Sequence, residues 1–283
     1  MNYYFLTGEN MKKFDGILIC TDLDGTLLRN DKSVSKENLD AIEYFKANGG
    51  MFTIVTGRMP VTARSICETV KPNVPIGCIN GGGVFDHKTE KLLWMASVDR
   101  SALEVIEAVD KNMPQIGIQV NTAKKVYFCK YNQAMVNFRK EINMPDLRCH
   151  YTEIDEPIAK IIFTEDNEKV LFDLIDLLNN HPKSKNFDFI RSQRTMYELL
   201  PKGVTKGTSL AKLTEILGVD IKKTVAIGDF DNDVELIRCA GVGYAVSNAC
   251  DAAKAVADRI TVSNEDHAIA KVIDDIDSGK LIF

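Results

Sequence analysis

The sequence has no excess of basic residues and no long apolar run. Its 283 residues include 35 Lys and Arg and 40 Asp and Glu, which gives a net charge of −5. Without a basic surface, we expect neither nucleic acid nor an anionic membrane to be the main partner. No apolar run approaches the ~18 residues of a membrane span. The apolar patch YYFL near the start is too short for a signal peptide.

Histidine is scarce, and cysteine motifs are absent. The seven cysteines are scattered and form no C-x-x-C pair, so we expect reduced, mostly buried thiols in a cytoplasmic protein. The histidines show no metal-ligand spacing, which argues against a zinc site. They are His87, His150, His181 and His267. Internal repeats and low-complexity segments are also missing, so we expect an ordinary globular fold.

Apolar runs of strand length alternate with amphipathic segments in the first part of the chain. The runs at 16–20, 51–57 and 75–83 are continuous, which is typical of parallel strands buried on both faces. Helices are predicted between them, with Ser35 as the N-cap of the first and Pro60 opening the second. This alternation predicts a doubly wound parallel sheet.

The middle of the chain, residues 85–195, has a different pattern. Its strands alternate more between apolar and polar residues, and one amphipathic helix lies among them. After it the β/α alternation resumes, with a helix that ends at Gly218 and turns Ile216 inward, and a buried strand over 224–229. We therefore predict an α/β fold in which a Rossmann-like core, residues 11–84 and 196–283, is interrupted by an inserted α+β domain at 85–195. Residues 1–10 are predicted to be an N-terminal extension.

Polar side chains follow three of the predicted buried strands. Asp22 and Asp24 come directly after the first strand and share a face if the chain stays extended. The tripeptide TGR (56–58) follows the second strand, and the run GDFDND (228–233) follows a later one. The carboxyl ends of parallel strands form one edge of a sheet, where ligands bind in open α/β folds. We therefore expect these clusters to meet in one site.

Carboxylates gathered in one place repel one another and stay partly protonated unless a cation binds. An all-oxygen ligand set suits Mg²⁺, which also keeps room for water and phosphate oxygens. Lys206 adds a positive charge and Thr56 a hydroxyl, and together these groups are typical of a site that holds a phosphoryl group. The residues predicted to hold Mg²⁺ are Asp22, Asp24, Asp229 and Asp233.

Each of these features also has an ordinary structural interpretation. The Asp-Gly pair at 24–25 alone is most often a turn, and only its coincidence with the other clusters favours a site. An EF-hand loop does not fit, because its sixth position needs Gly and is here Leu27 or Val234. Arg58 either neutralises charge near the site or lies on the surface, and both interpretations stay open.

In their order and separation, the motifs resemble those of the haloacid dehalogenase-like phosphatases. The resemblance is to the Cof-type subgroup, type IIB, in which a large α/β cap of the C2 kind is inserted after the second motif. Residues 85–195 match that cap in size and position, not by motif. The matching segments are DLDGTLL (22–28), TGR (56–58), NGGGVFD (80–86), PKGVTKGTSL (201–210), GDFDND (228–233) and SNA (247–249).

The resemblance implies a role for each motif residue. Asp22 is expected to be the nucleophile that forms an aspartyl-phosphate, and Asp24 the general acid that later acts as the base. Mg²⁺ is expected to be held by Asp22, the backbone carbonyl of Asp24 and Asp229, with support from Asp233. The groups expected to bind phosphoryl oxygens are Thr56, Gly57, Lys206, Asn232 and the backbone N–H groups around Leu23 and Gly25.

The expected function is the Mg²⁺-dependent hydrolysis of a small phosphorylated metabolite, foremost a sugar phosphate, in the cytoplasm. The subgroup also contains phosphatases for flavin mononucleotide or pyridoxal phosphate, and a phosphomutase, and these functions stay open for this chain. A regulatory protein that binds a phosphometabolite without turning it over also stays open. The protein is expected to be a monomer or a weak homodimer.

Overall fold

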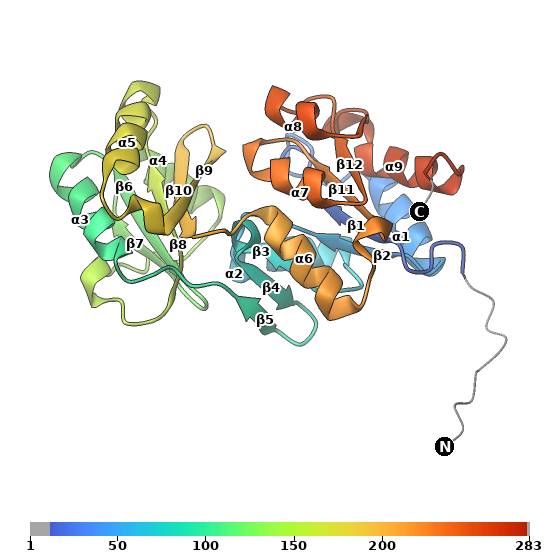
Figure 1. Cartoon of the computed structure of the whole chain (residues 1–283), viewed down its shortest axis with the longest axis horizontal. Coiled ribbons are helices and arrows are strands. Elements are labelled where there is room, and N and C mark those ends of the chain that lie inside the picture. The colour runs from blue at the N-terminus through green and yellow to red at the C-terminus, as the bar shows by residue number, and fades with distance from the viewer. Residues whose placement is uncertain (1–11, 282–283) are drawn as a thin grey trace, which may run out of the picture.

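The computed structural model describes residues 12–281, which form two lobes (Figure 1). The first lobe is built on a five-stranded sheet with the order β13-β12-β11-β1-β2, and all of its pairings are parallel. Its strands are β1 (Leu18–Thr21), β2 (Met51–Ile54), β11 (Thr224–Gly228), β12 (Val242–Ala245) and β13 (Arg259–Ile260). The predicted parallel core sheet is therefore confirmed. The predicted extension at residues 1–10 lies outside the described residues.

Helices cover both faces of this sheet. Leu18 of β1 lies in the apolar cluster that includes Leu210 of α6, whereas the next residue, Ile19, lies in the opposite cluster with Ile42 of α1. Successive strand residues point to opposite faces, so one short strand contributes to both halves of the core. The helices are α1 (Lys36–Ala47), α2 (Pro60–Val70), α6 (Lys206–Leu217), α7 (Val234–Cys239), α8 (Asp251–Val256) and α9 (Ala268–Asp277).

The residues predicted to begin α1 and to end α6 do so, but one prediction about the buried face of α6 is wrong. The Ser35 hydroxyl accepts a hydrogen bond from the Asn38 N–H at the start of α1, and Gly218 ends α6 in the left-handed conformation. Ile216, predicted to face inward, is instead 43% exposed. It lies at the edge of the apolar stripe of α6 that Leu210 and Leu213 form, beyond the reach of the sheet.

The third predicted strand departs from expectation. Only Ile76–Cys78 (β3) is extended, and it pairs antiparallel with β4 (Gly83–Asp86), which in turn pairs with β5 (Lys91–Met95). A single parallel bridge between Val55 and Gly77 joins this three-stranded sheet to the end of β2. The strand is short because Ile79, Asn80 and Gly81 all have positive φ and turn the chain.

The second lobe is a five-stranded antiparallel sheet with the order β7-β6-β8-β10-β9. The helices α3 and α5 pack on the face that is turned away from the first lobe (Figure 1), and α4 packs near β6 and β7 on the other. The strands are β6 (Gly117–Thr122), β7 (Val126–Lys130), β8 (Ile158–Thr164), β9 (Phe187–Gln193) and β10 (Met196–Pro201). The helices are α3 (Ala102–Asn112), α4 (Gln133–Glu141) and α5 (Glu168–Asn180).

The sheet pairing refines the expected boundary between the lobes. Residues from 196 onward are predicted to belong to the core, yet β10 (Met196–Pro201) pairs with β8 and β9 of the second lobe. The chain therefore returns to the first lobe only after Pro201, where α6 begins at Lys206. The 3₁₀ turns complete the fold at Ile79–Gly81, Tyr151–Glu153, Ser184–Asn186, Ile221–Lys223, Asp231–Asp233 and Asn264–Asp266.

Candidate active site

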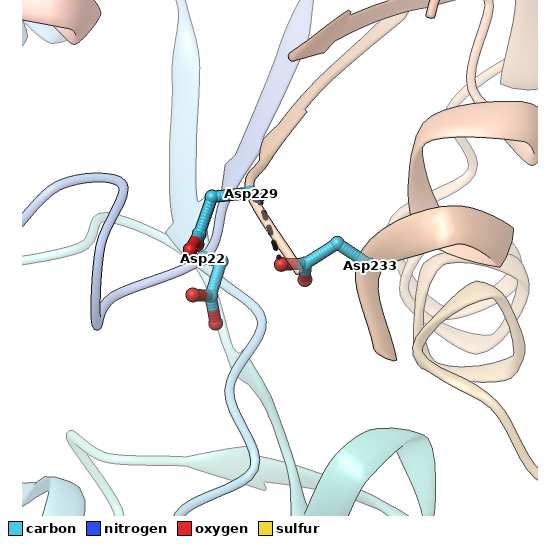
Figure 2. Close-up of side chains that lie close together, drawn as sticks. All are labelled: Asp22, Asp229 and Asp233. Carbon is cyan, nitrogen blue, oxygen red and sulfur yellow. Dashed lines mark hydrogen bonds between the residues drawn. The ribbon is translucent and has the colours of Figure 1, made fainter. Parts of the chain in front are cut away.

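Three aspartates converge at the carboxyl edge of the parallel sheet (Figure 2). Asp22 follows β1 and Asp229 follows the adjacent strand β11, while Asp233 ends the 3₁₀ turn Asp231–Asp233. One carboxylate oxygen from each lies within 4.8 Å of the others. The three are brought together because β1 and β11 are neighbouring parallel strands that end at the same level. The sequence prediction placed all three at this edge.

Lys206 is the cation of this cluster. Its ammonium group is buried at the first residue of α6 and donates to Asp22 Oδ1 at 2.5 Å and to Asp233 Oδ1 at 2.6 Å. Burial alone would lower the pKa of Lys206, but the two carboxylates outweigh it and raise the pKa above its usual value. Lys206 therefore stays charged and fixes the position of the Asp22 carboxylate.

The remaining negative charge is not balanced by this single ammonium group. Burial, followed by repulsion from Asp233, raises the pKa of Asp22 well above its usual value in spite of Lys206. Burial and the charge of Asp233 likewise raise the pKa of Asp229 to about 7. A hard divalent cation would favour the ionised forms of Asp22 and Asp229, and the carboxylate oxygens of the cluster are the ligands that Mg²⁺ prefers. The donor set thus fits a magnesium ion.

Asp233 also holds the backbone of the site. Its Oδ2 accepts hydrogen bonds from the N–H groups of Asp229 at 3.0 Å and Phe230 at 3.1 Å, and the first of these is drawn in Figure 2. Asp233 is fully buried. Its two oxygens therefore serve the loop after β11 on one side and Lys206 on the other, and this orients the Asp229 carboxylate.

The loop after β1 requires glycine at position 25. Gly25 has a φ of +89°, and a Cβ there would lie 2.4 Å from Asp229 Oδ2. Beside it, the Thr26 hydroxyl donates to Asp229 Oδ1 at 2.7 Å, and Asn248 donates to the Gly25 carbonyl at 2.9 Å. Both the backbone conformation and the close approach of Asp229 exclude a side chain at this position.

The carboxylate of Asp24 is bound by a pair of cations. Arg58 contacts both of its carboxylate oxygens at 2.9 to 3.1 Å, and Lys32 donates to Oδ1 at 2.9 Å. Burial alone would raise the pKa of Asp24, but the charges and hydrogen bonds of Arg58 and Lys32 lower it below its usual value. Arg58, which the sequence left between two interpretations, therefore lies at the site.

A cavity of about 720 Å³ opens above these residues, between the two lobes. The first lobe contributes Asp22, Asp24, Thr56, Gly57, Arg58, Asp229 and Asn232 to its lining. The second lobe contributes Gln119, Asn121, Lys160, Ile162, Ser192, Met196 and Glu198. A phosphate at the aspartates would therefore have its organic part enclosed by residues of the second lobe.

Three of the residues predicted to contact phosphate lie in the cavity wall, and the predicted contact through the backbone N–H of Leu23 stays a prediction. Thr56, Gly57 and Asn232 line the cavity. The side chain of Leu23 is buried in the core of the first lobe, and its carbonyl accepts from the N–H groups of Thr26 and Leu28. Lys206 reaches the site through Asp22.

A buried polar network at the lobe boundary was missed by the sequence analysis. Asn80 accepts a hydrogen bond from Asn232 at 2.9 Å and donates to Glu198 at 2.7 Å. Glu198 forms a buried ion pair with Lys160, whose ammonium group also donates to the Gly57 carbonyl at 2.9 Å. A charged residue in an otherwise apolar strand, such as Lys160 in IAKIIFT, is the signal that could have found this network.

A model of the haloacid dehalogenase-like hydrolase family matches residues 19–273. Among curated proteins, the chain is 26% identical to 5-amino-6-(5-phospho-D-ribitylamino)uracil phosphatase YitU of Bacillus subtilis, over 90% of this chain and 96% of that one. The match extends through both lobes, so the chain is similar to a complete relative and not to a shared core alone.

Solved structures have the same fold. A haloacid dehalogenase-like hydrolase from Bacteroides thetaiotaomicron superposes with a TM-score of 0.80 at 24% identity, over 92% of this chain and 99% of that one. The subclass IIB sugar phosphatase BT4131 superposes with a TM-score of 0.81 at 19% identity, over 92% and 99% of the two chains. Among the described residues, no helix is long and apolar enough to cross a membrane.

Proposed function

The chain belongs to the haloacid dehalogenase-like hydrolase family and is a phosphatase, and we propose that it is a Mg²⁺-dependent one acting through an aspartyl-phosphate at Asp22. Its substrate is a small phosphorylated metabolite. The observation that carries the proposal is the position of Asp22, which is held by Lys206 at 2.5 Å beside Asp229 and Asp233 at the floor of the cavity.

Asp22, Asp229 and Asp233 are the side chains that would hold the magnesium ion, together with the backbone carbonyl of Asp24. Bound there, the ion supplies charge neutralisation for the carboxylates and for the phosphoryl oxygens. The raised pKa values of Asp22 and Asp229 support this assignment, because a bound cation would favour the ionised form of both groups.

In the first step, a carboxylate oxygen of Asp22 attacks phosphorus, and the bond from phosphorus to the leaving oxygen breaks. Asp24 donates a proton to that oxygen, so the product leaves as an alcohol. In the second step, Asp24 takes a proton from a water molecule that attacks phosphorus. The bond between phosphorus and the Asp22 oxygen breaks, so inorganic phosphate departs and Asp22 becomes a free carboxylate again. Lys206 holds Asp22 in place through both steps.

Asp24 must carry a proton before it can act as an acid. In the structure, Arg58 and Lys32 hold it ionised. An incoming phosphate dianion offers these two cations another partner, because a phosphate ester binds Arg and Lys as strongly as a carboxylate does. We infer that binding of the substrate draws them off Asp24 and lets its pKa rise toward the value that proton transfer requires.

The second lobe is the proposed cap, which selects the leaving group and excludes water. Its residues line the cavity opposite the aspartates, which supports that role. We propose a sugar phosphate or a related phosphorylated polyol as the substrate. BT4131 is a sugar phosphatase, and YitU acts on a phosphorylated ribityl chain, according to their names.

A sensor that binds a phosphometabolite without turnover has less support than an enzyme. Such a sensor would not need Asp22, Asp24, Lys206 and Asp229 together, and all four are present at the site. A phosphomutase would use the same nucleophile, and it would return the phosphoryl group to a second hydroxyl of the substrate rather than to water.

We also propose a cytoplasmic location, because the seven cysteines of the chain are all free thiols. A disulfide-forming compartment would favour paired cysteines instead. We keep a monomer or weak homodimer as the proposed state.

The first experiment is phosphate release from p-nitrophenyl phosphate with Mg²⁺, with EDTA, and with the variant Asp22→Asn. We expect release only with Mg²⁺, and a loss on the order of 10⁴-fold or more in Asp22→Asn, since removal of the nucleophile removes the covalent step. The control is Asp166→Asn, which changes an exposed aspartate. Metal-dependent release by a folded Asp22→Asn protein would exclude Asp22 as the nucleophile.

A further inference from the structure

Two buried amide side chains lie in the cavity wall opposite the aspartates. Gln119 and Asn121 are two residues apart in β6, so they share a face of the strand. They are 1% and 0% exposed, and both line the cavity. Their neighbours Ile118 and Val120 belong to the apolar cluster on the opposite face of the sheet. The amides are therefore directed toward the space between the lobes.

Each of these amides has one group without a hydrogen-bond partner. Asn121 Nδ2 donates to Gln119 Oε1 at 3.1 Å, while Gln119 Nε2 and Asn121 Oδ1 have no partner in the described chain. Exchanging nitrogen and oxygen in both amides reverses the internal bond and still leaves one NH₂ group and one carbonyl oxygen free. An unsatisfied buried polar group costs about 1–3 kcal/mol. The pair thus offers a donor and an acceptor to something that enters the cavity.

The charged residue opposite this pair in the sheet already has hydrogen-bond partners of its own. Lys160 is directly opposite Asn121 in the sheet, but its ammonium group binds Glu198 at 2.7 Å and the Gly57 carbonyl at 2.9 Å. Gln119 lies opposite Ile162, which also lines the cavity. Across the sheet, the two amides therefore face a lysine whose charge is already paired and an apolar side chain, which favours a neutral ligand group over an ion.

We propose that Gln119 and Asn121 determine specificity by binding an adjacent hydrogen-bond acceptor and donor on the leaving group of the phosphate ester. The inference rests on the proposed phosphatase function and names what its cavity selects. Two kinds of leaving group carry this chemistry. One is a polyol, whose neighbouring hydroxyls donate and accept, and the other is a heterocycle with adjacent N–H and C=O groups.

The test compares three phosphate esters on the Mg²⁺-loaded enzyme. Pentyl phosphate has no such pair, a pentitol phosphate has neighbouring hydroxyls, and an alkyl phosphate that ends in a uracil ring has adjacent N–H and C=O groups. The variants are Asn121→Leu and Gln119→Met, which keep the approximate volume and remove the amide. The control is Thr122→Val in the same strand, because Thr122 is equally buried but bonds Glu156 and does not line the cavity.

We expect the wild type to prefer one of the two pair-bearing esters over pentyl phosphate, and the preferred ester identifies the leaving group. In Asn121→Leu and Gln119→Met, kcat/KM for that ester should fall about 10- to 100-fold, because each variant leaves a ligand group unpaired. The value for pentyl phosphate should fall by a clearly smaller factor, because this ester has no group for the amides to bind. Thr122→Val should keep the wild-type preference. An unchanged preference in both amide variants, or an equal loss for all three esters, would overturn the inference.

Failure of the inference about the amide pair can be distinguished from failure of the proposed function. If the wild type releases phosphate from none of the esters, the phosphatase proposal fails, and the same panel is measured as binding by calorimetry. Tighter binding of a pair-bearing ester that is lost in Asn121→Leu would still support the amide pair. Equal binding of the three esters by the wild type would overturn the inference.

Discussion

The carboxylate of Asp24, which lines the cavity, is bound by two cations. Arg58 bonds both of its oxygens and Lys32 bonds one of them. The sequence could predict that Asp24 follows a buried strand, because strand ends are readable from apolar runs. It could not predict the partner, because chain spacing does not give the direction of the Arg58 side chain. The structure thus adds a reason why Asp24 is ionised before substrate binds.

Replacing Arg58 should raise the pKa of Asp24. In Arg58→Met, we expect the limb of the pH–rate profile that depends on Asp24 to move to higher pH by about one unit, since an adjacent opposite charge lowers a carboxyl pKa by roughly 1–3 units. The measurement is kcat/KM for p-nitrophenyl phosphate from pH 5 to 9. The same variant should also bind substrate more weakly if Arg58 moves to the phosphate.

The control for this variant is Arg64→Met. Arg64 lies on α2 and forms an exposed ion pair with Glu90, so its removal should leave the profile unchanged. A profile of Arg58→Met that superposes on that of the wild type would show that Arg58 does not set the pKa of Asp24.

At the scale of helices and strands, periodicity identified the elements with the strongest patterns. The helix α2 was predicted to begin at Pro60 and spans Pro60–Val70, and the strand predicted at 224–229 is β11 (Thr224–Gly228). The elements that were not predicted as such are the helices α3, α4 and α8 and the strands β4, β5, β9, β10 and β13. α8 has only six residues, and β9 reads FDFIRSQ, in which polar residues obscure the alternation.

The prediction of the third strand was wrong for a different reason. The run at 75–83 is apolar enough for a central strand, but three successive residues with positive φ end it at Cys78. Two of these, Ile79 and Asn80, are not glycine, so composition gives no warning of the turn. Asn80 is held there by contacts with Glu198 and Asn232, which are distant in sequence. Tertiary contacts therefore decide this turn.

The ion pair between Lys160 of β8 and Glu198 of β10 connects the second lobe to the loop of the first lobe at Gly57. Both side chains are buried, so removal of one partner leaves an uncompensated charge. We expect Lys160→Met to lower the free energy of unfolding by about 3–5 kcal/mol, and the double variant Lys160→Met/Glu198→Gln to recover part of it. The measurement is chemical denaturation with a double-mutant cycle.

The same lobe provides a matched control. Lys125 and Glu156 also form a Lys–Glu pair, but their side chains are 50% and 37% exposed. Lys125→Met should therefore change the unfolding free energy by less than about 1 kcal/mol. If both lysine variants cost the same, burial does not determine the contribution of the pair at Lys160.

For the molecule as a whole, the site works against stability when no cation is bound. Asp22, Asp229 and Asp233 meet beside one lysine in a chain that already carries a net charge of −5. The site is placed where the two lobes meet, and its carboxylates are largely removed from water. The geometry of the site is therefore unfavourable for the stability of the fold, and a bound cation would offset this cost.

The pH dependence of stability should reveal this cost. Burial raises the pKa of Asp22 well above its usual value and that of Asp229 to about 7, whereas an unfolded aspartate titrates near ~3.9. Between these values the folded protein binds more protons than the unfolded chain, so this contribution to stability falls as pH rises from about 4 through about 7. Mg²⁺ binds the ionised carboxylates, so its stabilising effect should grow over the same interval.

The measurement is the melting temperature with Mg²⁺ minus that with EDTA, at pH 5 and at pH 8. The difference cancels the titration of carboxylates elsewhere in the chain, so it reports on the site alone. We expect a larger difference at pH 8, and a smaller one at both values in Asp229→Asn, which removes one ligand. Asp166→Asn should match the wild type, because Asp166 is exposed and remote from the cluster. A difference that is equal at the two pH values would mean that Asp22 and Asp229 do not release protons when the metal binds, and the unbalanced negative charge inferred for this site would then be wrong.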